Sequence, residues 1–330
     1  MRRSGNLVPA VVFTMSLVAI NSLSGYLQPS SPVMPQIEKL RLHNKRLTTD
    51  LDRLMFEAIP VGTASPRRLA EAMRYAVVPG GKRFRALLTV AVAELVGGSY
   101  DHALRLGAAI ECVHAQSLIH DDLPCMDNDD FRRGKPTVHK AFDEATAVLA
   151  GDSLLALAFE LLGHKATHPD SGVRIRLVVT LARAMGQDGL AGGQMMDLYP
   201  PPDASVDEVA RCETLKTGAL ISYCVEAGAM LGHCTAEQLV ALTRFARALG
   251  RAFQIRDDIL DRIGDEIIVG KAVGKDQGKG RQTTLSVMGL DKTRTEVARL
   301  ARECEDALAG FGQDASILRD LTRLAINRLN

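Results

Sequence analysis

From about Pro35 onward, apolar residues recur at helical spacing through almost the whole chain, and this periodicity limits the fold more than any other feature. Leu40, Leu47 and Leu51 give the pattern of the first such segment. No stretch alternates Val, Ile or Thr with polar residues between hairpin turns, so strands are not expected. With 46% hydrophobic residues and no internal repeat, the sequence predicts one large all-α domain of about ten or more helices over residues 36–330.

Proline and glycine mark the expected helix limits. Pro66 opens a second helix, because proline is favoured in the first turn, and Gly80-Gly81 ends it. Pro124 stops the helix that carries the first polar cluster described below. The further expected helices cover residues 84–95, 101–123, 141–162, 173–185, 205–231, 236–260, 291–309 and 314–328.

The first 35 residues differ from the rest of the chain. Arg2 and Arg3 precede an apolar run over residues 7–20, which resembles the hydrophobic region of a signal peptide and is short for a membrane span. Residues 21–35 are rich in Ser and Pro, as a linker is. We expect residues 1–35 to be an extension, either disordered or translated from a start codon assigned ahead of Met34. Six cysteines without C-x-x-C spacing favour free thiols, and so a cytoplasmic location over secretion.

The composition argues against one large class of function. The net charge is +1, no long run of one sign occurs, aromatic residues make up 4% and Trp is absent. Neither an electrostatic footprint for nucleic acid nor a stacking platform for bases is expected from these values, and no nucleic-acid partner is predicted.

Three carboxylates lie in the otherwise apolar stretch 118–127. Asp121 and Asp122 fall in the last turn of the predicted helix, where the helix dipole disfavours negative charge, and Asp127 follows. A solvated acidic patch would be flanked by polar residues instead. A divalent metal ion with oxygen ligands would offset the electrostatic cost.

A second acidic cluster lies far downstream on another apolar helix. Asp257 and Asp261 are spaced i, i+4 on one face, and Asp258 is adjacent to the first of them. One such cluster is as often a solvated helix face as a metal site, but two matching clusters on core helices are harder to explain that way. If they face each other, they would hold several Mg²⁺ ions together with phosphate oxygens and water.

Basic residues suited to an anionic ligand are also present. Lys82, Arg83 and Arg85 follow Gly80-Gly81 at a predicted helix start, a position that favours phosphate. Each basic segment alone is equally consistent with a solvated surface, and none matches the Gly-Lys-Ser/Thr phosphate-binding loop. The other basic groups near breaks in the helical pattern are Arg132, Arg133, Lys216 and the Gly/Lys-rich loop 270–281.

Together these motifs resemble the trans-isoprenyl diphosphate synthases. The six-residue spacing from Asp121 to Asp127 is similar to that of the short-chain group, which makes farnesyl or geranylgeranyl diphosphate. The resemblance implies helices around a central cavity, the isoprenoid synthase fold, and a homodimer. It also implies condensation of isopentenyl diphosphate with dimethylallyl, geranyl or farnesyl diphosphate. The similarity runs from about residue 66 to 290, and its other elements are Gly80-Gly-Lys-Arg83, Gly193-Gln194 with Asp197, Lys216-Thr217 and Gln254.

The resemblance assigns roles to individual residues. Roughly three Mg²⁺ ions per active site are implied, bridging carboxylates and diphosphate oxygens. Their implied ligands are Asp121, Asp127 and Asp257, with Asp122, Asp258 and Asp261 in support. The residues implied to hold the allylic diphosphate are Arg132 and Lys271, and those for isopentenyl diphosphate are Lys82, Arg85, His114 and Arg133. The residues implied to line the reacting centre are Lys216, Thr217 and Gln254, with Gln194 and Asp197 supporting them.

Product length is expected to depend on Gln116 and Ser117. They precede Asp121 by five and four residues, where the family often has a bulky aromatic side chain that blocks the pocket. Each isoprene unit needs about one helical turn of depth, or about 5.4 Å. Without an aromatic floor, the C20 product geranylgeranyl diphosphate is expected, with the C15 product farnesyl diphosphate as the alternative.

The chain departs from the family pattern at three places. Ala86 and Leu285 stand where Pro is usual, Thr284 where an aromatic residue is usual, and Arg281 where Lys is usual. Two other functions were weighed against chain elongation. A terpene cyclase should lack the second aspartate cluster and the basic site, and a non-catalytic partner subunit should have lost metal aspartates. All of these features are present, so the sequence predicts a chain-elongating prenyltransferase.

Overall fold

The computed structural model describes residues 34–62, 66–78, 81–263 and 282–326, with backbone only at 34–39 and 261–263. Residues 1–33 of the predicted extension therefore lie outside the described residues, and so does the side chain of Asp261. The same holds for Gly80, for Arg281 and for the Gly/Lys-rich loop with Lys271. The described chain is helical almost throughout, which confirms the all-α prediction.

The helices follow the predicted order. In the first half they are α1 (Met34–Ala58), α2 (Arg67–Val77), α3 (Phe84–Leu95), α4 (Tyr100–Asp121), α5 (Val138–Ala141), α6 (Glu144–Gly163) and α7 (Ser171–Met185). In the second half they are α8 (Leu190–Leu198), α9 (Val206–Glu213), α10 (Ala219–Met230), α11 (Ala236–Ile263), α14 (Thr284–Met288), α15 (Leu290–Ala307) and α16 (Ser316–Ile326). A short 3₁₀ segment (Ala309–Ala315) joins the last two helices.

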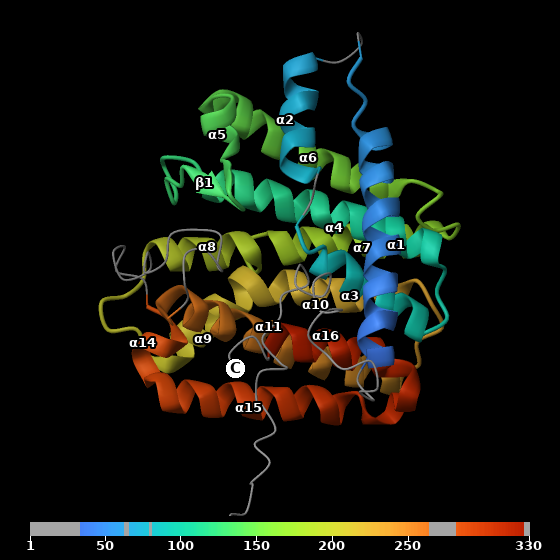
Figure 1. The fold of residues 1–330 in the computed structure, drawn as a ribbon, viewed down its shortest axis with the longest axis vertical. Helices are drawn as coiled ribbons and strands as arrows, with labels where there is room; N and C mark the ends of the chain where they lie inside the picture. Colours follow the sequence, from blue (N-terminus) through green and yellow to red (C-terminus); the bar gives the residue numbers. More distant parts are fainter. Residues whose placement is uncertain (1–33, 63–65, 79–80, 264–281, 327–330) are drawn as a thin grey trace, which may run out of the picture.

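Most of the long helices run across the molecule side by side, whereas α1 and α2 run almost at right angles to them (Figure 1). α4 packs against α1, α3 and α6, and α10 packs against α3, α7 and α11. The α8, α9 and α14 helices gather at one end, on the left in Figure 1, where the segment after α4 also lies. The C-terminal end of α4, which carries the first acidic cluster, therefore lies at this end of the helical stack.

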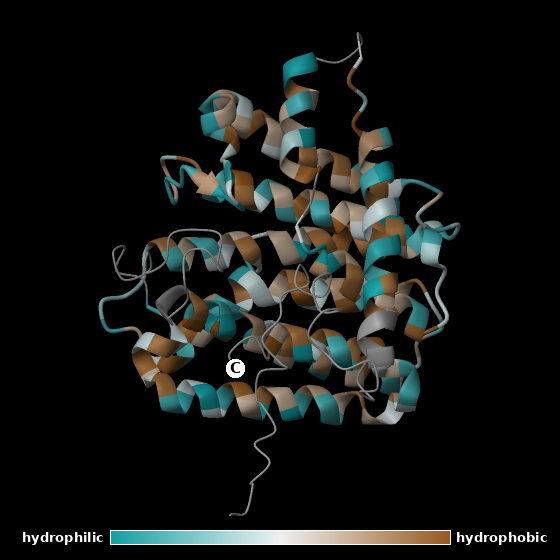
Figure 2. Cartoon of the chain, viewed as in Figure 1, coloured by the Kyte–Doolittle hydropathy of each residue, from teal (hydrophilic) through white to brown (hydrophobic). Residues whose placement is uncertain are grey.

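α4 is the central core helix. Leu106, Ile110 and Val113 on it are fully buried. Gly107 lies so close to α3 that an added Cβ would come within 3.0 Å of the Cβ of Ala86. Hydrophobic residues dominate the inner helices. Along α15, at the lower edge, hydrophilic and hydrophobic residues alternate (Figure 2). This close packing makes α4 a rigid support for whatever its C-terminal end carries.

Arg83 is a structural residue at the start of α3. Its side chain is almost fully buried and pairs with Glu111 (3.3 Å) and Asp52 (2.6 Å), and its backbone is left-handed, with φ of 50°. The Glu111 carboxylate also accepts a hydrogen bond from the backbone N–H of Ala86 (3.3 Å), which a proline could not donate. The departure from the family pattern at Ala86 therefore gives the start of α3 a backbone donor to Glu111.

Two of the expected helices differ in their limits. The segment predicted as one helix over 205–231 forms α9, a π-helical turn (Thr214–Gly218) and α10, and the segment over 141–162 is preceded by the separate α5. α8 was not predicted, because its sequence Leu-Ala-Gly-Gly-Gln contains two poor helix formers in succession.

The expectation that no strands occur is wrong for four residues. β1 (Phe131–Arg132) pairs antiparallel with β2 (Lys135–Pro136). Arg133 and Gly134 connect them with φ of 53° and 74°, the left-handed pair that a tight hairpin turn requires. The strands are too short to show any alternation, so the only available signal was the Arg-Gly turn.

One described helix, α6, has the length and apolar composition of a membrane span, with a mean hydropathy of 1.7. Half of this apolar stretch is buried within the molecule, where α6 packs against α2, α4, α5 and α7. Core packing therefore accounts for the buried half of α6.

Candidate active site

The first acidic cluster lies where α4 ends. The helix stops at Asp121, and Asp122 caps it, so the predicted position of both residues in the last turn is confirmed. Backbone hydrogen bonds fold the following residues back on this end, from Asp127 N–H to the Asp121 carbonyl (2.7 Å) and from Asp129 N–H to the Asp122 carbonyl (3.2 Å). Asp121 and Asp127 are held together by this tight turn.

Asp121 lies in an unfavourable place for a negative charge. Burial raises its pKa to about 6, and the nearby Asp127 and Asp122 raise it as well, while Lys216 and Arg132 lower it. The Lys216 ammonium also pairs with Asp197 on α8, at 2.6 Å between Nζ and Oδ2. The structure therefore brings the end of α4, the π-helical turn and α8 to one place.

Asp122 faces the hairpin. Arg132 on β1 donates from Nε to both carboxylate oxygens, at 2.8 and 2.9 Å, and Nη2 lies 2.6 Å from Oδ1. Asp129 is a further anion near Nη2, at 3.8 Å. Burial raises the pKa of Asp122, and the hydrogen bond from Arg132 opposes that shift. The hairpin thus returns Arg132 to the acidic cluster.

The second acidic cluster lies on α11. Asp257 is partly exposed and pairs with Arg256, whereas Asp258 is buried and accepts a hydrogen bond from Gln254 Nε2 (2.8 Å). Gln254 in turn accepts a hydrogen bond from the Thr217 hydroxyl. The predicted grouping of Lys216 and Thr217 with Gln254 is consistent with this contact between the π-helical turn and α11.

Glu213 belongs to the same region and was missed in the sequence. It is buried at the end of α9 and accepts hydrogen bonds from the backbone N–H (3.0 Å) and hydroxyl (2.7 Å) of Thr284. Burial raises its pKa, while hydrogen bonds from Thr284 and with Asp258 lower it. A single Glu in a helical run carries no distinguishing pattern, so only the fold places it here.

A cluster of cations surrounds His114 on the same helix that ends at Asp121. Arg85 on α3 donates to His114 Nε2 (3.4 Å). Burial lowers the pKa of His114 well below its usual value, and Arg85 and Arg133 lower it further. The guanidinium of Arg133 lies on the backbone of Gly81, where an added Cβ would come within 2.5 Å of Cζ. Three of the four residues predicted to bind isopentenyl diphosphate therefore meet, and Lys82, the fourth, follows Gly81 directly.

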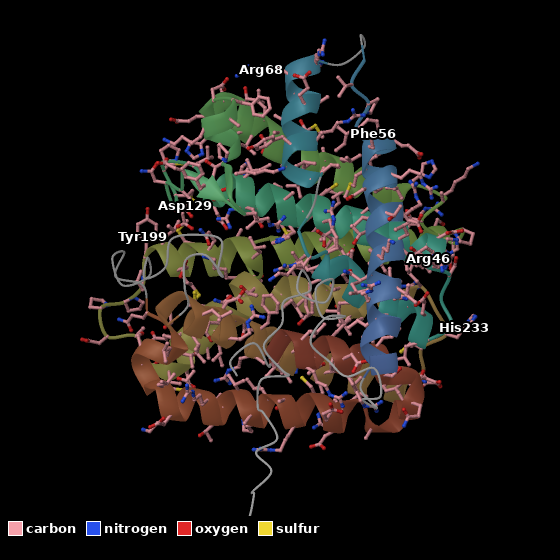
Figure 3. All side chains as sticks on the ribbon, in the orientation of Figure 1. Arg46, Phe56, Arg68, Asp129, Tyr199 and His233 are labelled. Carbon is pink, nitrogen blue, oxygen red and sulfur yellow. The ribbon has the colours of Figure 1, made fainter. Side chains whose placement is uncertain are left out.

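Further polar residues lie at the same end of the molecule, and one of them, Gln194, belongs to a predicted motif. Asp129 and Tyr199 lie at the end where α8 and the hairpin gather (Figure 3). The Gln194 side chain on α8 is buried, and neither polar atom of its carboxamide has a hydrogen-bond partner within the described residues. A buried amide without partners is unusual, and it fits a site that a polar ligand completes.

The sequence model of one family, described as polyprenyl synthetase, matches residues 66–310. This chain belongs to the polyprenyl synthetase family. It is 43% identical over 285 residues to the heterodimeric geranylgeranyl pyrophosphate synthase large subunit 1 of Arabidopsis thaliana, covering 84% of this chain and 74% of that protein. It is 40% identical over 309 residues to the chloroplastic geranylgeranyl pyrophosphate synthase of Capsicum annuum, covering 92% and 82%.

Solved structures give the same family. An FPP/GFPP synthase from Zymomonas mobilis superposes with a TM-score of 0.79 at 45% identity, covering 86% of this chain and 98% of that chain. A geranyltransferase from Legionella pneumophila also gives 0.79, at 32% identity, covering 91% and 100%. The isoprenoid synthase fold is therefore confirmed for this polyprenyl synthetase.

The carboxylates of this polyprenyl synthetase fit a hard divalent cation that completes its shell with other oxygens. Within the described residues no group of three or more metal-ligating side chains is assembled. Asp122 and Asp258 accept hydrogen bonds from Arg132 and Gln254, and a backbone turn brings Asp121 and Asp127 together where burial raises the pKa of Asp121. Mg²⁺ accepts a few carboxylates plus water and phosphate oxygens. The predicted ligands Asp121, Asp127 and Asp257 therefore stay a prediction that suits this donor set.

The residues predicted to set product length lie on α4 within the core. Ser117 is buried, and its hydroxyl donates to the His114 carbonyl (3.0 Å). The Gln116 carboxamide contacts His120 Nδ1 (3.0 Å), and the His120 ring lies on Gly151 of α6, where an added Cβ would come within 2.2 Å of Nε2. The Gln116 side chain is therefore fixed toward α6. Ser117 has the smaller side chain of the two.

Proposed function

We propose that this polyprenyl synthetase joins isopentenyl diphosphate to allylic diphosphates and makes geranylgeranyl diphosphate. One observation carries the proposal. α4 carries His114, beside which the cations Arg85 and Arg133 lie, and seven residues later it carries Asp121 of the first acidic cluster. Seven residues correspond to about 10 Å along a helix. One helix therefore offers a site for an anion and a site for metal-bound diphosphate close enough for two substrates to meet.

The residues of the chain divide the work by charge. Arg85, Arg133 and His114 would bind the diphosphate of isopentenyl diphosphate through charge-assisted hydrogen bonds. Mg²⁺ held by Asp121, Asp127 and Asp257 would, when bound, neutralise the charge that develops on the departing diphosphate. Lys216, which Asp197 holds at 2.6 Å, adds a fixed positive charge beside Asp121.

The remaining residues of the site orient the reacting groups and exclude water. Thr217 and Gln254 hold the π-helical turn against α11. The apolar core around α4 keeps the site dry, which matters because water would capture an allylic cation before the second substrate attacks it. Chain elongation needs both the charged end and this apolar interior.

The C20 product is the finer part of the proposal. It is supported by the lack of an aromatic side chain at Gln116 and Ser117, and by relatives named geranylgeranyl pyrophosphate synthase. Farnesyl diphosphate is the second candidate. It is favoured by the size of Gln116 and by the similarity to the FPP/GFPP synthase of Zymomonas mobilis.

We also propose a homodimer in a reducing compartment. Leu149 and Val148 on α6 and Ile175 and Val179 on α7 are exposed apolar side chains on two helices that pack together. A second copy of the chain would cover them. All six cysteines are described and none forms a disulfide, which supports the proposed cytoplasmic location.

The test is incubation of the purified protein with Mg²⁺, isopentenyl diphosphate and each allylic starter, followed by chromatography of the products. We expect a C20 alcohol after dephosphorylation. Asp121→Ala and Asp257→Ala should each lower turnover by several orders of magnitude with an unchanged circular dichroism spectrum. The exposed Asp314→Ala is the control and should keep wild-type turnover. Near-normal activity of either site variant would contradict the proposed mechanism.

A further inference from the structure

A buried chain of polar side chains connects α14 to the π-helical turn. Thr284 donates to Glu213 from its backbone N–H and from its hydroxyl, which lies 2.7 and 2.9 Å from the two carboxylate oxygens. Glu213 shares a hydrogen bond with Asp258, and Asp258 accepts from Gln254 (2.8 Å). Gln254 accepts from Thr217. The chain is therefore continuous across α14, α9, α11 and the turn that carries Lys216.

We infer that Glu213 is a positioning residue for the reacting centre: it fixes Asp258 and Gln254 against the turn that carries Lys216 and Thr217. The inference rests on the proposed function and deepens it. Nothing in the sequence motifs assigns a role to Glu213, and its carboxyl group does not need to touch a substrate for this role.

Burial explains why the contact is rigid. Glu213, Asp258 and Thr284 are all almost fully buried, with exposed fractions of 6%, 6% and 1%. Burying a carboxyl group is costly unless hydrogen bonds satisfy it, so the geometry in which every partner is present is strongly preferred. Glu213 thereby sets the orientation of Asp258 as well as the position of α14.

The position of Glu213 in the chain explains how its contact with Thr284 can affect Lys216 and Thr217. It is the last residue of α9, and the π-helical turn Thr214–Gly218 starts immediately after it. Any displacement of Glu213 therefore moves the backbone of Lys216 and Thr217. A π-helical turn inside a helical run is a rare conformation that needs support from its surroundings, and it is often found at functional sites.

The partner of Glu213 departs from the usual family pattern. Thr284 stands where the resembling family usually has an aromatic residue. Its hydroxyl and its backbone N–H both donate to the Glu213 carboxylate. Glu213 and Thr284 therefore act as one unit. Once one of them is substituted, substituting the other should have little further effect.

The test compares Glu213→Ala, Glu213→Gln, Thr284→Val and Thr284→Ser by steady-state kinetics with both substrates varied. Glu213→Ala should lower kcat about tenfold or more while KM for each substrate stays within about threefold, because orientation at the reacting centre is lost and substrate binding is kept. Glu213→Gln should stay within about threefold of wild-type kcat, because its amide can accept from Thr284 and donate to Asp258. Thr284→Ser should resemble the wild type, and Thr284→Val should show a smaller loss than Glu213→Ala.

Thr322→Val is the matched control for a lost buried hydroxyl. Thr322 is buried on α16 and donates to the Leu318 carbonyl (2.8 Å), away from the polar chain. It should lower the melting temperature as Thr284→Val does, with unchanged kcat. A Glu213→Ala variant that melts earlier but keeps wild-type kcat would reduce Glu213 to a purely structural residue and overturn the inference. A Glu213→Gln variant as slow as Glu213→Ala would also overturn it, because charge rather than hydrogen-bonding pattern would then matter.

A double-mutant cycle on unfolding tests the contact without any turnover. The effects of Glu213→Gln and Thr284→Val on the free energy of unfolding should be non-additive, and additive effects would contradict the contact. If the wild type turned over no starter at all, the proposed function would fail, while this cycle would still decide whether Glu213 and Thr284 act as one unit. If Glu213→Ala did not fold, the Gln and Thr284 variants would decide the inference.

Discussion

At the residue scale, His114 shows how the fold changes the chemistry of a side chain. It is partly buried beside Arg85, and both burial and the neighbouring arginines lower its pKa well below the usual value of 6.5. The folded protein therefore keeps the ring neutral where the unfolded chain would protonate it. A neutral ring accepts the hydrogen bond from Arg85, which leaves the guanidinium oriented for an anion.

This shift makes the stability of the protein without ligands depend on pH. The folded-state pKa of His114 lies below the unfolded value, so the unfolded chain binds more protons as the pH falls below about 6.5. The free energy of unfolding should therefore decrease below that pH, and the decrease should be smaller in His114→Gln. Urea denaturation between pH 5 and pH 8 measures it. The exposed His233→Gln is the control, and an equal pH dependence in His114→Gln and wild type would contradict the prediction.

Product length is also decided by single side chains. Ser117 is buried on α4, and Gln116 is fixed toward α6 by His120. Replacing either with a large aromatic residue should shorten the space along α4 by about one turn, or about 5.4 Å. Gln116→Tyr and Ser117→Phe should therefore shift the product from C20 toward C15, as measured by chromatography. An unchanged distribution in both variants would place the floor of the pocket on another helix.

At the element scale, α8 and the π-helical turn depend on close backbone contact. Gly193 lies on α8 where an added Cβ would come within 2.1 Å of the Lys216 backbone nitrogen. No side chain fits there, so the two segments would have to separate.

Gly193→Ala should therefore displace Lys216 and lower kcat by about tenfold or more, since small displacements at a reacting centre have large effects. Gly163→Ala is the matched control, because Gly163 ends α6 with nothing within 4 Å of its added Cβ. It should keep wild-type kcat and melt no earlier. Equal kcat for the two variants would show that the contact between α8 and the turn does not position Lys216.

The elements that the sequence predicted well are those with long periodicity and clear ends. α3 was predicted over 84–95 and is Phe84–Leu95, and α4 ends within two residues of its predicted end. The hairpin, the π-helical turn and α14 were not predicted, because each is too short for a periodic pattern and depends on neighbours far away in the chain. Tertiary contacts decide such segments.

The candidate site follows the same rule. Pro124 after an apolar run predicted that Asp121 and Asp122 end a core helix, and the fold brings Arg85, His114 and Arg133 together as expected. The pairing of Asp122 with Arg132 and of Asp258 with Glu213 was not foreseen. A contact between residues on different helices depends on rotation about each helix axis, and sequence order alone does not give that rotation.

At the scale of the whole molecule, the exposed apolar side chains of α6 and α7 are the feature that a single chain leaves unexplained. Leu149 and Ile175 have exposed fractions of 56% and 63%. A carboxylate placed at a buried interface between two copies would lose its hydration, and without a partner this raises the free energy of the dimer. Leu149→Glu combined with Ile175→Glu should therefore give monomers.

Size-exclusion chromatography with light scattering measures the outcome. The control is Leu42→Glu on α1, which is also 56% exposed and lies on a different helix. It should leave the mass unchanged. A wild-type protein with the mass of one chain would contradict the proposed dimer, and so would a double variant with unchanged mass.

The cations around His114 have a consequence for the molecule as a whole. The structure records no ion pair for Arg85 or Arg133 within its described residues; Glu111 is the anion near Arg133, and Arg132, Arg83 and Arg85 are the neighbouring cations. Like charges held together repel, and this repulsion lowers the stability of the protein when the site holds no anion. A bound anion removes the repulsion and shifts the folding equilibrium through its own binding free energy. Binding of diphosphate at the proposed site should therefore also stabilise this end of the fold.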